Sequence, residues 1–341
     1  MTRRFFRWLG LVVTAVVLLI SGLEAAGQAP GAPAAAGRVT SGTARTPWGD
    51  PDLQGDWTSE GEFGVPFERP VEFGDRQELT DEEFAARLAQ ARERDKNDLD
   101  AVSVLTGEVD MPTAPVPHWR EQGTSSRRTS LVIDPPNGRI PPRVVPPAPP
   151  GRTCGGLLTG DPCDSAQEYG LHVRCIIHGA GFPAPMFPTL YNANLRIVQG
   201  PGVVAITYEM IHDTRVIPLD GRSPLGADIR LWLGDARGHW EGDTLVVESA
   251  NFTGKTSYRG SGKTLRLIER FSRADDQSLR YEVTAVDPAT WTAPWTAALD
   301  LKARPAGLGL FEYACQEGNY GLFNMLSTAR GAERARAQRQ Q

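Results

Sequence analysis

The sequence predicts a mainly β protein, built as an antiparallel meander or barrel. Three observations support this fold class: short alternating or β-branched runs fill the second half of the chain, turn residues separate them, and no helical pattern lies between them. Consecutive strands without intervening helices favour antiparallel pairing over a parallel α/β sheet. The expected strands lie at 195–211, 215–219, 229–233, 244–248, 264–272, 279–286 and 295–301.

The N-terminus has the three-part layout of a secretory signal peptide, expected over residues 1–27. Arg3, Arg4 and Arg7 precede an apolar run from 8 to 20, and small residues follow as far as Ala26. This run is shorter than the roughly 20 apolar residues that a membrane span needs. The sequence therefore predicts an exported protein, periplasmic or extracellular, with no stable membrane span after cleavage of the signal.

The rest of the chain divides by composition into four parts. A flexible Ala/Pro/Gly spacer is expected at 28–45 and an irregular arm at 46–150, with Trp48 and Trp57 as its anchors. Within the arm, Thr80 and Glu83 form a capping box that predicts a helix over 80–94. Residues 134–150 hold eight prolines in seventeen positions and indicate a linker before the β domain, expected at 151–330. A C-terminal helix from Tyr320 to about Ala337 and a polar tail at 331–341 complete the chain.

Charge and composition limit the partners. The formal net charge is −5, and cleavage near Ala26 removes three arginines and one glutamate, which gives −7. Sequence-independent binding of nucleic acid depends on basic patches, so we expect no nucleic-acid partner. Four arginines near the C-terminus are expected to form a solvated helix face: Arg330, Arg334, Arg336 and Arg339. Gly262-Lys263-Thr264 resembles the end of a phosphate-binding loop, but the required glycine before it is absent, and we expect no cofactor. The sequence does not specify an oligomeric state.

The cysteine count predicts two disulfides, because four cysteines in an oxidising compartment tend to pair. Three connectivities are possible for Cys154, Cys163, Cys175 and Cys315. We prefer Cys154 with Cys163, as a local clip, and Cys175 with Cys315, which would tie the start of the β region to its end. A metal site that includes His172 or His178 is the alternative, but no zinc-type spacing supports it, and we expect no metal ion.

The most polar part of an expected strand is the segment from Tyr208 to Arg215. If the strand continues through it, the side chain of His212 points to the apolar side, and Glu209, Asp213 and Arg215 share the opposite face. Glu269 lies in a second alternating run, LRLIERF, which places a carboxylate among apolar neighbours.

An imidazole and a carboxylate in one interior would be suited to proton transfer, and all five residues are therefore candidate catalytic groups. The simpler alternative is that each is a structural polar group with its own partner. Four further side chains are candidates to line a ligand opening: Tyr208, Met210, Trp291 and Trp295.

Several motifs resemble an uncharacterised family of exported bacterial proteins. They are TPWGDPDLQGDW, EMIHDTRVIPLDGR, GHWEGDTLVV, DPATWTAPWT and EYACQEGNYG, and they span nearly all of the expected mature chain. The resemblance implies export and a single-family architecture, and it implies no activity. The strands around GHWEGDTLVV also look like those of lipocalin-type barrels, which is a similarity of architecture alone.

Two functions are therefore expected, with a third as a further alternative. The first is a β-barrel that binds a small, largely apolar molecule, with the arm folded over its mouth. In that case the interior of the barrel should keep His212 and Glu269 apart or already paired with other groups. The second is a cofactor-independent enzyme (a lyase, isomerase or hydrolase), which requires these residues to converge on one open pocket. A structural envelope protein would have no pocket.

Overall fold

The computed structural model describes residues 44–100, 125–144, 163–178, 184–189, 191–255 and 258–340, with side chains only as far as 93 in the first range. The predicted signal peptide, nearly all of the spacer and Cys154 lie outside these ranges. The described part is mainly β, as predicted, with two α-helices, α2 (Asp81–Asp100) and α3 (Tyr320–Arg339). Its ten strands are β1 (Gly55–Thr58), β2 (Val132–Asp134), β3 (Asn194–Gly200), β4 (Val203–Tyr208), β5 (Thr214–Pro218), β6 (Asp235–Glu241), β7 (Thr244–Ala250), β8 (Arg266–Asp275), β9 (Ser278–Val286) and β10 (Trp295–Ala303).

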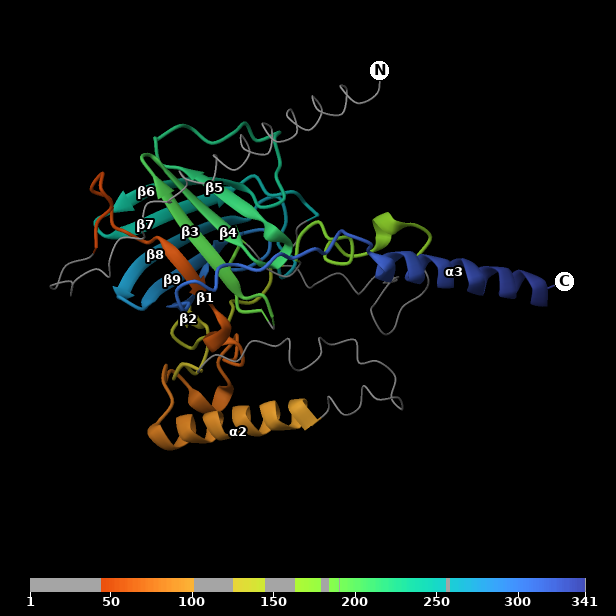
Figure 1. Cartoon of the computed structure of the whole chain (residues 1–341), viewed down its shortest axis with the longest axis horizontal. Helices are drawn as coiled ribbons and strands as arrows, with labels where there is room; N and C mark the ends of the chain where they lie inside the picture. The colour runs from red at the N-terminus through yellow and green to blue at the C-terminus, as the bar shows by residue number, and fades with distance from the viewer. Residues whose placement is uncertain are drawn as a thin grey trace, which may run out of the picture. The chain divides into compact units, whose positions relative to one another are not determined.

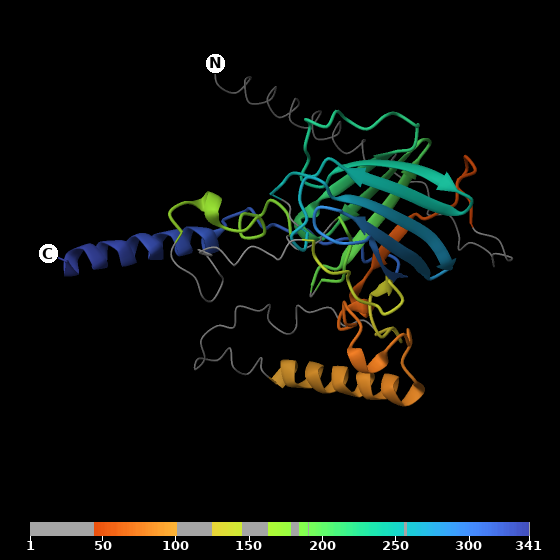
Figure 2. The same ribbon diagram turned by 180° about the vertical axis from the view of Figure 1, so that it is seen from behind.

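These strands form a single antiparallel sheet that curls into a nearly closed barrel (Figures 1 and 2). Its order is β5-β4-β3-β1-β10-β9-β8-β7-β6, and β2 pairs with β10 on the same edge as β1. The two ends of this order, β5 and β6, approach each other through side chains. A Cβ atom added to Gly238 of β6 would lie 2.8 Å from Ile217 and 2.5 Å from Leu219. The absence of a side chain at Gly238 therefore lets the two edges meet.

The N-terminal arm belongs to the barrel, which differs from the expected division at the Pro-rich linker. β1 lies between β3 and β10, with Trp57 paired to both Leu195 and Ala303, and β2 pairs with β10. Residues 45–341 form one compact unit. β1 was not predicted because it has only four residues, and glycines and prolines surround it. The arm is thus a structural part of the sheet and not a separate cover over it.

The expected strands agree with the structure in the second half of the chain, with two exceptions. The run at 195–211 is a hairpin, in which Gly202 takes a left-handed φ of 74° between β3 and β4. The run at 229–233 is not a strand. The strand forms instead at β6, which contains Gly238 in its interior and ends at a turn at Gly242. Gly238 was misleading because glycine here serves close packing and not a turn.

Alternation along the strands places the core inside the barrel, because successive side chains point to opposite faces. The inward side chains are almost completely buried and largely apolar; they include Leu195, Ile197, Val204, Ile206, Leu245, Val247, Leu267, Phe271, Val283, Ala285, Ala297, Leu299 and Leu301. Side chains therefore occupy the interior of the barrel.

Both helices begin at side-chain caps. The Thr80 hydroxyl accepts from the backbone N–H of Glu83, and the Glu83 carboxylate accepts from the N–H of Thr80, which confirms the predicted capping box. α2 extends six residues beyond the expected end at 94, to Asp100. The side chain of Asn319 accepts from the N–H of Leu322 at the start of α3, and this helix continues to Arg339, through most of the expected polar tail. Arg334, Arg336 and Arg339 are exposed on it, as predicted, whereas Arg330 is half-buried and donates to the carbonyl oxygens of Cys163 and Asp164.

Candidate functional site

A buried ion pair lies inside the barrel, between Arg215 of β5 and Glu269 of β8. Nη1 of Arg215 donates to Oε1 of Glu269 at 2.9 Å, and Nη2 donates to Oε2, so the contact is bidentate. The side chains are 2% and 0% exposed. A buried charge of this kind requires a partner and further hydrogen bonds, because its removal from water is costly.

Three hydroxyl groups complete this interior cluster. Tyr281 donates to Oε1 of Glu269 at 2.8 Å, Ser249 accepts from Nη2 of Arg215 at 3.2 Å, and Tyr208 lies 3.5 Å from Nη1. Tyr208 and Tyr281 are fully buried. Every member comes from a different strand, so the cluster joins β4, β5, β7, β8 and β9 from within. We call these five residues the interior cluster.

The charges of the interior cluster are fixed by its geometry. Burial alone would lower the pKa of Arg215, but the adjacent Glu269 carboxylate outweighs it and raises that pKa above its ordinary value. Burial raises the pKa values of Tyr208 and Tyr281. The guanidinium therefore stays charged and the two phenols stay neutral over the physiological pH range. Such a cluster can orient a polar group.

Arg215 was expected on the face opposite to His212, and the structure reverses these positions. β4 ends at Tyr208, and a short 3-10 helix at Met210–His212 follows, in which Ile211 and His212 adopt left-handed φ values of 61° and 47°. These two residues break the alternation, so β5 starts again with Arg215 pointing inward. Glu269, in contrast, lies inside the barrel as its alternating run predicts.

His212 and Glu269 therefore do not share one interior, which corrects the expectation from the continuous strand. His212 is exposed, and its Nδ1 donates to the carbonyl oxygen of Tyr313 at 3.0 Å. The neighbouring Asp213 is half-buried, and its Oδ2 atom has no hydrogen-bond partner among the described residues. Burial raises the pKa of Asp213 to about 6.

Glu209, the fifth candidate, is buried but lies apart from the interior cluster. Its carboxylate accepts from the side chains of Asn192 and Asn194 and from the backbone N–H of Phe311, at 2.6, 3.3 and 3.1 Å. Arg304 lies 3.8 Å away. Glu209 thus fastens the segment that follows β10 to the start of β3. The five candidate catalytic residues separate into the pair Arg215 and Glu269 inside the barrel and three residues at the β4–β5 connection.

The four candidate lining residues are all buried, and two of them belong to an aromatic cluster at one end of the barrel. Trp295 is fully buried, with Trp291 at 5.5 Å, Phe67 at 5.7 Å and Tyr258 at 6.0 Å between ring centroids. Phe187 stacks on Tyr258 at 5.7 Å. Tyr208 belongs to the interior cluster, and Met210 is completely buried in the 3-10 helix.

A loop segment, residues 184–189, closes this end of the barrel, and no pattern in the sequence predicts its position. Met186 is 1% exposed, and its backbone N–H donates to the hydroxyl of Tyr281 at 3.1 Å. The segment contains no helix or strand. Apart from the Met186 bond, no main-chain N–H of residues 184–189 donates a hydrogen bond to another described residue. The segment is therefore held mainly by the burial of Met186 and Phe187.

The predicted disulfide between Cys175 and Cys315 is confirmed, with a Cα–Cα distance of 5.7 Å. It ties the region before segment 184–189 to the region after β10. Cys163 is also disulfide-bonded, and its predicted partner Cys154 lies outside the described residues. In the described ranges, no group of three or more His, Cys, Asp or Glu side chains is placed to hold a metal ion, and no helix is long and apolar enough to cross a membrane.

Fold and site together define an antiparallel β-barrel with a hydrogen-bonded ion pair in its interior and an aromatic end closed by a loop. Comparison with known proteins finds no matching family model, no matching curated protein and no matching solved structure.

Proposed function

We propose that this chain is an exported protein that binds a small, largely apolar molecule at the aromatic end of its barrel. The observation that carries the proposal is the contact between Met186 and Tyr281. The backbone N–H of Met186, in a loop, donates to the buried hydroxyl of Tyr281, which itself donates to Glu269 of the interior cluster. A ligand that displaces segment 184–189 would find an apolar, aromatic cavity with one polar anchor at its base.

The arrangement of charges favours binding over catalysis. His212 lies on the surface, and Glu269 is already engaged by Arg215 and Tyr281. A general base must reach the proton that it abstracts. Here both oxygens of the Glu269 carboxylate already accept hydrogen bonds, from the charged guanidinium of Arg215 and from the neutral hydroxyl of Tyr281. The interior cluster is suited to orient a ligand's hydrogen-bond donor, with the aromatic rings in contact with its apolar body.

The test uses N-phenyl-1-naphthylamine, a neutral fluorophore with an apolar body and a single N–H donor. We expect its fluorescence to rise in a saturable way with the mature chain. Met186→Ala should tighten binding, because truncation weakens the burial that holds the segment in place. Leu301→Ala is the control: it also truncates a fully buried side chain, but at the opposite end of β10 from Trp295, and it should lower stability without tighter binding.

A second variant examines the polar anchor. Tyr281→Phe keeps the ring and removes the hydroxyl, so it should weaken binding of the naphthylamine by about tenfold, which corresponds to one hydrogen bond of about 1.4 kcal/mol. Absence of saturable binding, or equal effects of Met186→Ala and Leu301→Ala on binding, would contradict the proposal.

Export is supported by the signal-like N-terminus and by the Cys175–Cys315 disulfide. Mass spectrometry of the chain recovered outside the cytoplasm should find an N-terminus between about Ala25 and Ala32. Recovery of that fraction with Met1 intact would refute cleavage of the signal.

A further inference from the structure

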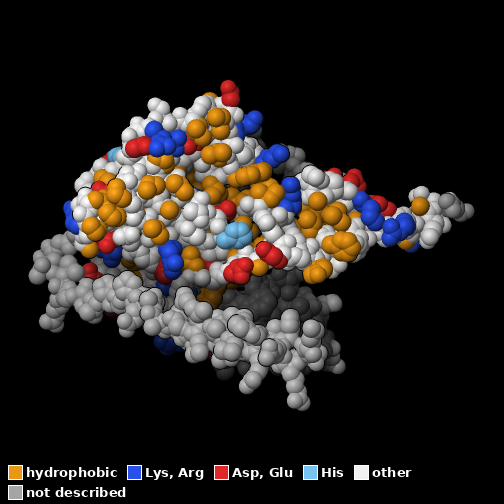
Figure 3. All heavy atoms as spheres, turned by 45° about the horizontal axis from the view of Figure 1, so that its top comes forward, with side chains coloured by type: hydrophobic (Ala, Val, Ile, Leu, Met, Phe, Trp, Pro, Cys, Tyr) orange, Lys and Arg blue, Asp and Glu red, His pale blue; other side chains and the backbone are white. Residues whose placement is uncertain are grey.

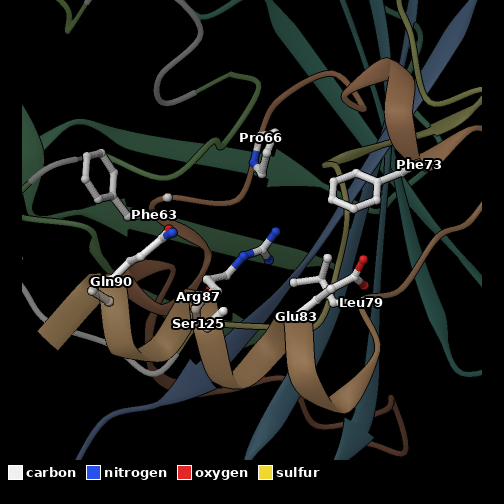
Figure 4. Close-up of a pocket in the computed structure, with 11 residues that line it drawn as sticks. Phe63, Pro66, Phe73, Leu79, Glu83, Arg87, Gln90 and Ser125 are labelled. Carbon is white, nitrogen blue, oxygen red and sulfur yellow. The ribbon is translucent and has the colours of Figure 1, made fainter.

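A groove lies between α2 and residues 63–79 of the arm, outside the barrel (Figure 4). Its volume is about 540 Å³, which is within the range of small-molecule sites. Most of its walls are apolar and come from Phe63, Pro66, Phe73, Leu79, Ala86 and Ala91. The groove is therefore separate from the interior cluster and uses none of its residues.

The guanidinium of Arg87 points from α2 into this groove (Figure 4). Its Nη1 donates to the carbonyl oxygens of Ser126 and Arg128, at 3.0 and 2.7 Å. Nε and Nη2 donate to no other residue in the described part of the chain. These two nitrogens lie on the same edge of the planar guanidinium, in the geometry that binds a carboxylate with two parallel hydrogen bonds.

The charge of Arg87 is incompletely balanced by its surroundings. Burial lowers the pKa of Arg87, and the charge of Glu62 offsets this only in part. Glu62 is itself engaged by the hydroxyl of Ser126 at 2.7 Å. Glu83, which also lines the groove, binds both terminal nitrogens of Arg76 and the N–H of Thr80. An anion in the groove would therefore meet a cation that no carboxylate of the described residues contacts.

We propose that this groove binds a small molecule with an aromatic or aliphatic body and one carboxylate, and that the carboxylate pairs with Nε and Nη2 of Arg87. The apolar walls fit the body, and the single guanidinium fits a single anionic group. The volume matches that of small-molecule sites, and the occupant proposed here is such a molecule. This site is additional to the barrel and does not depend on it.

The experiment is isothermal titration of the mature full-length chain with 2-naphthoate, and in parallel with the neutral 2-naphthalenemethanol. We expect saturable binding of the carboxylate and at least tenfold weaker binding of the alcohol. Arg87→Gln should remove this preference. Because that variant also disturbs the bonds to Ser126 and Arg128, a second pair of variants leaves Arg87 intact.

Ala86→Trp fills the groove, whereas Ala89→Trp makes the same substitution at an exposed position of α2 that does not line it. The first should weaken naphthoate binding by about tenfold or more, and the second should change it by less than about twofold. Tyr281→Phe should leave this binding unchanged. Absence of naphthoate binding, equal losses in the two tryptophan variants, or a loss confined to Tyr281→Phe would each overturn the proposal.

Discussion

Arg215 and Glu269 form a bidentate ion pair although their strands, β5 and β8, are not neighbours in the sheet. The pair reaches across the interior, past β6 and β7, and so connects the two sides of the seam where the sheet edges meet without a ladder of hydrogen bonds. This geometry explains why charged groups remain in an otherwise apolar core. They hold the sheet in its curled form.

The first prediction concerns that pair. Arg215→Met leaves the Glu269 carboxylate buried without its partner and should lower the free energy of unfolding by about 3–5 kcal/mol. The double variant Arg215→Met/Glu269→Met should lose much less than the sum of the two single variants, because it leaves no isolated charge. Urea unfolding of the four proteins measures this cycle. Additive losses would show that the two side chains do not depend on each other.

The second prediction concerns the contact between the sheet edges. A methyl group at position 238 would overlap Ile217 and Leu219, so Gly238→Ala should cost about 1–3 kcal/mol of stability. Gly226→Ala is the control, since a Cβ at that position meets nothing within 4 Å. If both variants unfold at the same urea concentration as the parent chain, the edges do not pack as described.

The third prediction is a pH dependence from Asp213. Its pKa is raised from 3.8 to about 6, so between these values the folded state binds a proton that the unfolded state does not. This raised pKa makes the folded state less stable as pH rises through about 6. Asp213→Asn should therefore increase stability at pH 8, and leave it nearly unchanged at pH 4. Solvent screening of this half-buried group limits the gain to about 1 kcal/mol. An equal effect at both pH values would contradict the assignment.

The fourth prediction concerns the disulfide. Cys175 and Cys315 close a loop with a sequence separation of 140, and on the loop-entropy model such a bond contributes about 5 kcal/mol. Cys175→Ser/Cys315→Ser removes it without leaving a free thiol. The double variant should unfold at a clearly lower urea concentration under non-reducing conditions, and an unchanged midpoint would show that packing alone holds these segments together.

Much of the fold could be predicted from sequence because it depends on local patterns. The alternation in β7 to β10 follows directly from burial of one face, and the Thr80–Glu83 cap depends on residues three positions apart. Glu269 was placed inside the barrel by the same alternation. The Cys175–Cys315 pairing was favoured because it joins the two ends of the β region.

The rest depends on conformations that residue type does not specify. Nothing in the side chains of Ile211 and His212 predicts their left-handed φ values, and these values alone decide whether Arg215 or His212 points inward. β1 is too short to show the two-residue alternation of a strand. Met186 is held at the end of the barrel by a contact with Tyr281, a residue that is distant in the sequence. Its place in the core is a property of the assembled barrel.

The pairing of β1 with β10 also determines when this protein can fold. Trp57 lies opposite Ala303, so a central strand from the beginning of the domain has no partner on that side until almost the entire chain has been made. Contacts between residues so distant in sequence form slowly, because a very long loop must close first. If the chain is exported as proposed above, it would cross the membrane unfolded, and this topology would keep the sheet incomplete until its last strand has emerged.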